Sequence, residues 1–496
     1  MSKKSNILFL FSDHQAYYKH GTEQGVHIQR PNFDRVAAEG AFFSNAYSAC
    51  PLCGPVRRSI LTGLFPHSHG ETQNDLNIPF AEKDTYLDVL SENGYKNYYY
   101  GKWHAGPGTA YDHGCEGFSY PSYSNPYTKE EYIRYLEEFN LPRPQIKIEH
   151  SVDFKRPFIK EGMIYEQQQE WCCEECSGIL LTPKETHEAF FLAHLACEQI
   201  DRFAQSKCDE PFSMRVDFWG PHQPYFITRE FADLYNPGDI PEHPSFSENV
   251  YNNNKPEVYW HEPTARINKD NQIIYPNPLP WNVWQEMLAR CYAQITMIDA
   301  ASGLILDALE RNGLLDNTMV ICTTDHGDAI GSHGGRFDKG CFMIEEILRV
   351  PLAIRYPEII PGGTVIHRPV SSVDFPVTML DAAGLAFEKK VHGKSLLRDL
   401  RQTTGYAVSE TFGHRGIHAV HFGRAITDGR YKYIYNRNQI EELYDLCVDP
   451  YELTNQIKNP NYASHVSRMK QAYWDWAVET GDTEGYYDVI RLAEVN

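Results

Sequence analysis

Two Asp-His pairs, each directly after an apolar segment, are the first residues that could carry chemistry. They are Asp13-His14, after residues 6–12, and Asp325-His326, after residues 319–323. Short apolar runs without polar alternation indicate buried strands. Ligand-binding residues of open α/β sheets gather at the carboxyl ends of strands, so we expect both pairs at one site. Carboxylates suit a hard divalent ion such as calcium, whereas imidazoles shift the preference toward manganese or another transition metal.

A cysteine that begins a predicted helix is the second candidate. Residues 53–63 read CGPVRRSILTG, which resembles the signature of the sulfatase family, Cys-x-Pro-Ser-Arg followed by a helix and Leu-Thr-Gly. Val56 stands where Ser or Ala is usual in that family. The resemblance implies that a maturation enzyme, which reads the Cys, Pro and Arg, oxidises Cys53 to formylglycine. It also implies that Arg57 fixes the formylglycine hydroxyl, although an isolated arginine here could equally lie on a helix surface.

The chemistry of sulfate transfer explains why an unmodified cysteine would be insufficient. A thiolate that attacked sulfur would leave a stable S-sulfonate. A hydrated aldehyde carries two hydroxyls: one attacks the sulfur, and deprotonation of the other then lets the C–O bond break and release sulfate. The predicted reaction is therefore covalent catalysis with a built-in release step.

Three further segments resemble the same family and imply the remaining catalytic residues. They read GKWH at residues 101–104, PHQP at residues 221–224 and DKG at residues 338–340. The resemblance implies that Lys102 binds a sulfate oxygen and that His104 orients or deprotonates the second formylglycine hydroxyl. His222 would protonate the leaving oxygen, and Lys339 would bridge the sulfate and that oxygen.

The resemblance also turns the two Asp-His pairs into a metal site. In this family one divalent ion binds the formylglycine and a sulfate oxygen, which implies five ligands here: Asp13, His14, Cys53 as formylglycine, Asp325 and His326. The family usually has Asp-Asp in the first pair, so His14 departs from its pattern. We expect calcium, with manganese as the alternative.

The elements that must position these residues alternate along the chain. Predicted strands at residues 95–100 and 212–218 and a long amphipathic helix at residues 284–312 continue the alternation, which indicates a doubly wound sheet with helices on both faces. The family resemblance implies an alkaline-phosphatase-like mixed sheet. We predict a catalytic domain over residues 1–402, with an insertion at 106–184, and a small α+β domain over residues 403–496.

Composition restricts the partners. Net charge is -20, which argues against nucleic acid, since nucleic-acid-binding proteins usually present a basic face. The apolar run at residues 7–11 is too short for a signal peptide or a membrane span, so we expect no membrane contact and a cytoplasmic protein; a chain whose signal peptide had been removed would look the same. Twelve cysteines then indicate reduced thiols, although Cys172, Cys173 and Cys176 could form a structural metal site.

The predicted function is hydrolysis of a small-molecule sulfate monoester, with sugar, aryl and steroid sulfates all open. One alternative is a phosphonate monoester or phosphodiester hydrolase of the same superfamily, and another is a non-catalytic relative in which Cys53 stays unconverted. Lys102 and His104 favour sulfate, because the phosphonate hydrolases have hydroxyl residues at those positions. His67, His69, Asn74 and Asp75 follow the Cys53 helix and either line a pocket or form an ordinary polar loop.

Overall fold

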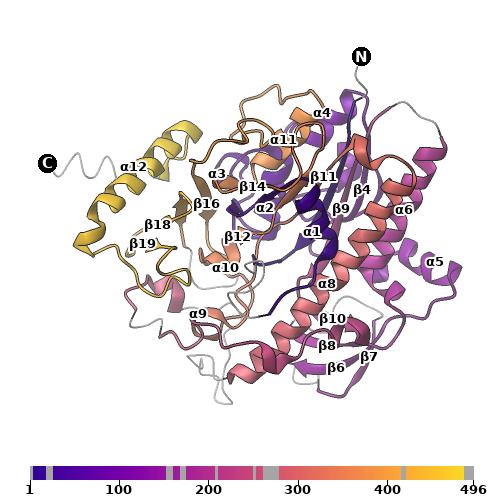
Figure 1. Cartoon of the computed structure of the whole chain (residues 1–496), viewed down its shortest axis with the longest axis horizontal. Helices are drawn as coiled ribbons and strands as arrows, with labels where there is room; N and C mark the ends of the chain where they lie inside the picture. The colour runs from indigo at the N-terminus through magenta and orange to yellow at the C-terminus, as the bar shows by residue number, and fades with distance from the viewer. Residues whose placement is uncertain are drawn as a thin grey trace.

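A mixed sheet of eight strands lies at the centre of the computed structural model (Figure 1). The structure describes residues 4–17, 26–151, 160–167, 175–206, 210–249, 253–260, 279–414 and 421–484. In spatial order the strands are β14 (Thr364–Ile366), β2 (Ala41–Phe43), β13 (Ala353–Arg355), β11 (Thr318–Thr324), β1 (Asn6–Asp13), β9 (Phe212–Pro221), β4 (Lys96–Lys102) and β5 (Cys115–Tyr120). The five strands from β11 to β5 run parallel, and β13 is antiparallel to both of its neighbours.

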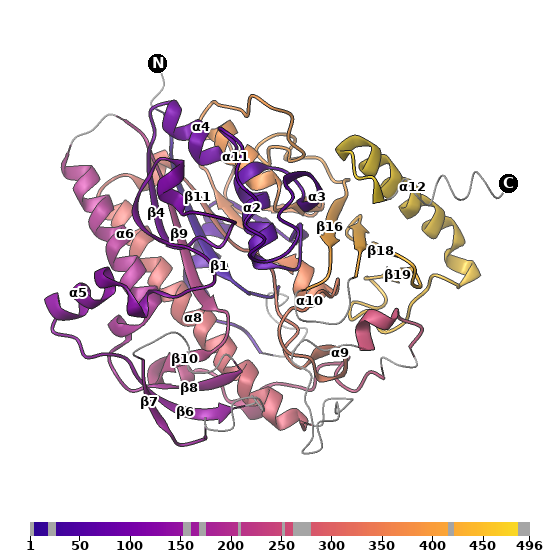
Figure 2. The ribbon, with the colours of Figure 1, turned by 180° about the vertical axis from the view of Figure 1, so that it is seen from behind.

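Helices cover both faces of this sheet, because its central strands are apolar on both sides. In β1, Leu8 and Leu10 face one hydrophobic core, and Ile7, Phe9 and Phe11 face the other. The first core is closed by α1 (Pro31–Glu39), α6 (Glu188–Gln205) and α8 (Trp281–Arg311), which lie in front in Figure 1. The second is closed by α2 (Cys53–Thr62), α4 (Tyr86–Glu92) and α11 (Asp374–Ala382), with α2 and α4 in front in Figure 2. The predicted doubly wound architecture is confirmed.

The segment predicted as an insertion divides between two sheets. Residues 97–102 of β4 pair in parallel with residues 115–120, so β5 is an edge strand of the main sheet and not part of an insertion. Among its other described residues, the segment forms α5 (Glu130–Glu138) and three strands of a separate sheet. This sheet has the order β10 (Tyr225–Thr228), β8 (Cys176–Leu180), β6 (Gln145–Ser151) and β7 (Ile164–Glu166). Cys176 is buried at the start of β8, whereas Cys172 and Cys173 lie outside the described residues.

The C-terminal part forms the predicted small α+β unit. Its antiparallel sheet contains β16 (Ala407–Thr411), β17 (Gly423–Thr427), β18 (Tyr431–Asn436) and β19 (Glu442–Asp445), and α12 (Ala463–Thr480) packs on it. A three-stranded sheet, β12 (Arg349–Val350), β3 (Ala46–Tyr47) and β15 (Val370–Ser371), contacts β16 and so joins the two parts. The described structure also contains four short α-helices: α3 (Pro66–His69), α7 (Arg229–Ala232), α9 (Ser332–Gly335) and α10 (Glu345–Leu348). Among the described helices, none is long and apolar enough to cross a membrane.

Candidate active site

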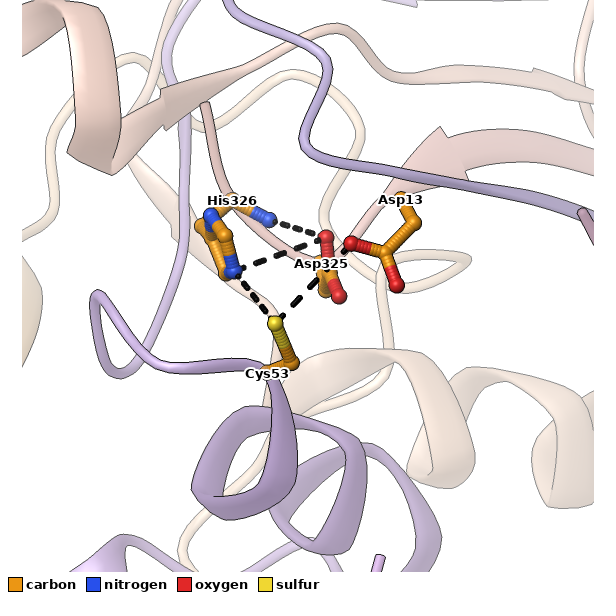
Figure 3. A group of neighbouring side chains, drawn as sticks. All are labelled: Asp13, Cys53, Asp325 and His326. Carbon is orange, nitrogen blue, oxygen red and sulfur yellow. Dashed lines mark hydrogen bonds and ion pairs between the residues drawn. The ribbon is translucent and has the colours of Figure 1, made fainter. Parts of the chain in front are cut away.

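Four potential metal ligands meet where two strands end and one helix begins (Figure 3). Asp13 ends β1, Asp325 and His326 directly follow β11, and Cys53 is the first residue of α2. The potential ligand atoms of these four residues lie within 4.8 Å of one another, and all four side chains are buried. The two Asp residues come together because β1 and β11 are neighbouring parallel strands in matched register, with Ser12 opposite Thr324.

The protonation states of these groups suit a divalent cation. Burial raises the pKa of Asp13, but Lys102 and Arg57 outweigh it and hold that pKa well below its usual value. Burial lowers the pKa of His326 to about 4, so its imidazole is neutral. Its Nδ1 lies 2.9 Å from the Gly327 carbonyl oxygen, which can only accept, so Nδ1 carries the proton. Nε2 therefore presents its lone pair toward Cys53 Sγ, 3.1 Å away. Two carboxylates and one neutral imidazole fit a divalent ion.

Arg57 and Lys102 fix the carboxylates from one side. Arg57 donates from Nη2 to Oδ2 of Asp13 (2.9 Å) and from Nε to Oδ2 of Asp325 (3.2 Å). Lys102 Nζ lies 2.5 Å from the same Oδ2 of Asp13. Since these contacts occupy Oδ2, Asp13 turns its Oδ1 toward Cys53 Sγ, at 3.9 Å. Arg57 is thus a fully buried structural cation of the site and not a helix-surface residue.

Asp217 belongs to this network, and the sequence reasoning missed it. Its carboxylate accepts from Arg57 Nη1 (2.8 Å), from Arg215 Nε (2.6 Å) and from the Tyr99 hydroxyl (2.8 Å), and it is fully buried. It lies in β9, four residues before the segment Pro221-His222. A signal was present in the sequence: Arg215 and Asp217 are opposite charges two residues apart in a strand, so they share one face of an otherwise apolar segment.

The His14 ring contacts the His326 ring (centroids 4.7 Å apart), but both of its nitrogens have carboxylate partners outside the four converging ligands. Its Nδ1 lies 3.2 Å from Asp328 Oδ2 and its Nε2 lies 3.0 Å from Asp338 Oδ1. Burial and Lys339 lower the pKa of His14, but the two carboxylates outweigh them and raise it to about 10. A protonated imidazole has no lone pair for a metal ion. The geometry therefore gives no support to the predicted ligand role of His14, whose backbone N–H instead donates to Asp325 Oδ1 (2.9 Å).

His222 and Lys339 lie on the other side of His14. The His14 and His222 rings stack with centroids 4.4 Å apart, and Lys339 Nζ lies 3.2 Å from His14 Nε2. His222 Nδ1 donates to the Gln223 carbonyl oxygen (2.8 Å), which leaves Nε2 facing the Tyr123 hydroxyl at 3.4 Å. Burial, then the nearby His14 and Lys339 cations, hold the pKa of His222 well below its usual value.

His104 follows β4 and is buried, yet neither ring nitrogen has a hydrogen-bond partner among the described residues. The Asp75 carboxylate is close, with Oδ1 3.6 Å from His104 Nε2. A buried imidazole without a hydrogen bond costs free energy, so such a group at a site calls for a partner that binds there.

The segment after α2 contains residues that stabilise the local structure and one that contacts the site. His67 donates its backbone N–H to Glu410 (2.9 Å), and His69 Nε2 lies 3.0 Å from the Ser59 hydroxyl, so both serve local structure. Asn74 Oδ1 accepts from the Gly54 N–H (2.9 Å), beside Cys53. The structure therefore brings together Cys53, Arg57, Lys102, Asp13, Asp325 and His326 in one network. His14, His222 and Lys339 contact one another beside it, and the Tyr123 ring contacts both His104 and His222.

Comparisons with known proteins address the fold and the family. The model of the Sulfatase family matches residues 5–385, and that of the N-sulphoglucosamine sulphohydrolase C-terminal region matches residues 331–478. An N-acetylglucosamine-6-O-sulfatase from Bacteroides thetaiotaomicron is 27% identical, covering 95% of this chain and 86% of that protein. An arylsulfatase from Clostridium perfringens is 28% identical, covering 99% and 97%.

Solved structures confirm the predicted alkaline-phosphatase-like fold. A structure in complex with its substrate D-glucosamine-2-N,6-O-disulfate matches with a TM-score of 0.70 and 22% identity, covering 97% of this chain and 99% of that one. A phosphonate monoester hydrolase of Agrobacterium radiobacter matches with a TM-score of 0.72 and 21% identity, covering 96% of each chain.

Proposed function

Because this chain belongs to the sulfatase family and is a sulfuric ester hydrolase, we propose that it cleaves a sulfate monoester with a formylglycine made from Cys53 and one divalent metal ion. The observation that carries this proposal is the convergence of Asp13, Asp325 and His326 on the side chain that begins α2. Two similar proteins are named as an N-acetylglucosamine-6-O-sulfatase and a Delta 4,5-hexuronate-2-O-sulfatase, and these names favour a sugar as the leaving group.

The proposed metal ligands are Asp13, Asp325, His326 and the formylglycine at position 53, with calcium expected and manganese as the alternative. When bound, the ion would stabilise the nucleophilic oxygen and polarise a sulfate oxygen. The chain itself supplies the geometry: Arg57 and Lys102 hold Oδ2 of Asp13, which keeps Oδ1 directed at residue 53.

Two imidazoles, those of His222 and His104, carry the proton transfers in this proposal. One hydroxyl of the hydrated formylglycine gives its proton to the neighbouring Asp325 carboxylate and attacks sulfur as the bond to the leaving oxygen breaks. His222 Nε2 gives the leaving oxygen a proton. In the free site His14 and Lys339 disfavour the protonated form of His222. A bound sulfate anion offsets those cations and so favours protonation. His104 then takes the proton of the second hydroxyl, the C–O bond to the sulfate breaks, and the aldehyde is restored.

Charge around the anion favours sulfate over a diester. Lys102, Lys339 and Arg57 are all buried within the site, and together they offset the charge that builds as the S–O bond breaks. Lys102 and His104 leave room for a small, dehydrated sulfate group between close cationic side chains. A diester carries a second substituent, which needs more space and fewer close cations. The competing assignment is a phosphonate monoester hydrolase, which shares the fold.

A direct test compares two cysteines of the same region. Cys53→Ala should abolish turnover of 4-nitrophenyl sulfate while the protein stays folded, and the buried neighbour Cys50 provides the control, since Cys50→Ala keeps the nucleophile. Mass spectrometry of the wild-type peptide should find formylglycine at position 53 after co-expression with a maturation enzyme. Near-normal activity of Cys53→Ala, or a clear preference of the wild type for a matched nitrophenyl phenylphosphonate, would overturn the proposal.

A further inference from the structure

Three polar side chains from separate loops surround the groups assigned to the sulfate. Asp75 lies in the loop after α3, Tyr123 in the loop after β5, and His414 in the loop after β16 of the small domain. None of them belongs to the nucleophile, the metal ligands or the proton-transfer pair described above. Asp75 contacts His104 and Tyr123 contacts His222, the two imidazoles proposed for proton transfer, and the loop of His414 is held against the loop of Asp75.

Asp75 reaches both the site and the solvent. Its Oδ1 is 3.6 Å from Nε2 of the buried His104, and its side chain is 43% exposed. The preceding residue fixes this position, because Asn74 Oδ1 accepts from the N–H of Gly54 at the start of α2 (2.9 Å). A leaving group on the sulfate would therefore meet a carboxylate at the rim.

Tyr123 contributes an aromatic ring between the two imidazoles, with its centroid 5.8 Å from the His104 ring and 5.6 Å from the His222 ring. Its hydroxyl lies 3.4 Å from His222 Nε2, the atom proposed to protonate the leaving oxygen. Its ring centroid is 4.9 Å from Lys102 Nζ and 4.8 Å from the Trp219 ring. The substituent on the leaving oxygen must pass this ring, and the apolar face of a sugar packs well on such a surface.

The small domain contacts the loop that carries Asp75. Gln73 Nε2 donates to the carbonyl oxygens of Phe412 (2.7 Å) and Gly413 (2.8 Å), which holds the loop after β16 against the loop of Asp75. The next residue is His414, whose pKa is lowered by burial and by the positive charge of Lys339, against the opposing effect of Asp338. Gln73 Oε1 and His414 Nδ1 are buried, and neither finds a hydrogen-bond partner in the part of the chain that the structure describes.

We propose that Asp75, Tyr123 and His414 form a leaving-group subsite that selects a polyhydroxylated leaving group, neutral or amino-bearing, and disfavours one with a second anionic group near the ester. A carboxylate accepts hydrogen bonds from hydroxyl and ammonium donors and repels a further sulfate or carboxylate. Hydroxyls also satisfy the buried Gln73 Oε1 and His414 Nδ1, which have no hydrogen-bond partner among the described residues. This inference rests on the proposed sulfatase function and names the substrate class of the same site.

The test uses matured full-length protein and three kinds of substrate. The first is a panel of neutral hexose and N-acetylhexosamine monosulfates, each substituted at a different hydroxyl. The second is the best of these sugars carrying an additional sulfate, and the third is 4-nitrophenyl sulfate. Asp75→Asn and His414→Ala are compared with Asp307→Asn, which removes one exposed charge from α8, with a side chain 66% exposed.

We expect the wild type to prefer the singly sulfated sugar by at least about tenfold in kcat/KM. Asp75→Asn should lower kcat/KM for that sugar about 10- to 100-fold more than for 4-nitrophenyl sulfate, the range expected for one hydrogen bond to a charged group. It should also reduce the ratio of kcat/KM for the singly sulfated sugar to kcat/KM for the same sugar with a second sulfate. His414→Ala should likewise affect the sugar more than the aryl ester, and Asp307→Asn should change neither.

Two results would overturn the subsite while leaving the proposed function intact. One is turnover of 4-nitrophenyl sulfate with no turnover of any neutral sugar monosulfate. The other is an equal loss of sugar and aryl activity in Asp75→Asn, which would make Asp75 a positioning residue for His104. If matured wild-type protein hydrolyses no sulfate ester at all, the proposed function itself fails.

Discussion

Asp217→Asn tests whether the buried Asp217 carboxylate stabilises the active site through its contact with Arg57. The side chain keeps its size, so packing is preserved, but the carboxylate that accepts from Arg57, Arg215 and Tyr99 loses its charge. The new amide nitrogen is also a donor and would face guanidinium donors. Removing one partner of a buried ion pair typically costs about 3–5 kcal/mol, because the remaining charge stays buried without compensation.

This cost converts into a measurable shift of the melting temperature. The entropy of unfolding is about 2.1 cal/mol/K per residue, which for 496 residues is about 1 kcal/mol/K. Asp217→Asn should therefore lower Tm by about 3–5 °C. Asp201→Asn is the matched control: it makes the same change in an exposed pair, where Asp201 Oδ2 lies 2.8 Å from Arg311 Nη2. Exposed pairs contribute about 0–1 kcal/mol, so its Tm should fall by less than about 1 °C.

Differential scanning calorimetry measures both variants, and turnover of 4-nitrophenyl sulfate measures the consequence for catalysis. Arg57 retains Asp13 and Asp325 in Asp217→Asn, so kcat/KM should fall less than in Arg57→Met. If Asp217→Asn melts within 1 °C of the Asp201→Asn control, the Asp217 carboxylate does not stabilise the fold by compensating the buried charges of Arg57 and Arg215. That result would refute the prediction.

Three further outcomes are expected. Asp325→Ala should lose the bound metal in elemental analysis, and full occupancy in that variant would show that the ligand set is wrong. His222→Gln should reduce kcat/KM about 10²–10⁴-fold for alkyl sulfates but less for 4-nitrophenyl sulfate, because an activated phenol needs little protonation; equal losses would mean that His222 only positions the substrate. Burial raises the pKa of Glu248, but His333 and Lys255 outweigh it and lower that pKa to about 2 from an ordinary value of 4.5. Because the folded pKa is the lower one, this carboxylate stabilises the protein above pH 4.5, and the contribution is lost as pH falls toward 2. Glu248→Gln should therefore show a flatter dependence of Tm on pH in that window than the wild type, and a parallel dependence would contradict the assignment.

Local patterns were sufficient to predict the main elements and the centre of the site. Asp13 and Asp325 follow apolar segments that could be recognised as buried strands, and the carboxyl ends of parallel strands meet at one edge of a sheet. Cys53 was identified from a contiguous motif, which needs no knowledge of distant residues. Family membership and the fold class are confirmed by the comparisons.

Other features depended on the tertiary structure. The strand Cys115–Tyr120 was placed in an insertion because its sequence has little periodicity, yet it pairs with β4 and extends the main sheet. His14 sits directly beside Asp13 in the sequence, and only the fold shows that its ring faces Asp328 and Asp338.

The sequence by itself determined the family, the doubly wound sheet and the chemical types around residue 53, because each is written in short contiguous segments. Only the tertiary structure decided which charges pair, that Asp217 supports Arg57, that Asp75 lies beside His104, and that Tyr123 lies beside His222. The physical reason is that pairing and desolvation depend on distances between residues hundreds of positions apart. A linear motif carries no information on those distances, whereas the packed sheet and its loops set them.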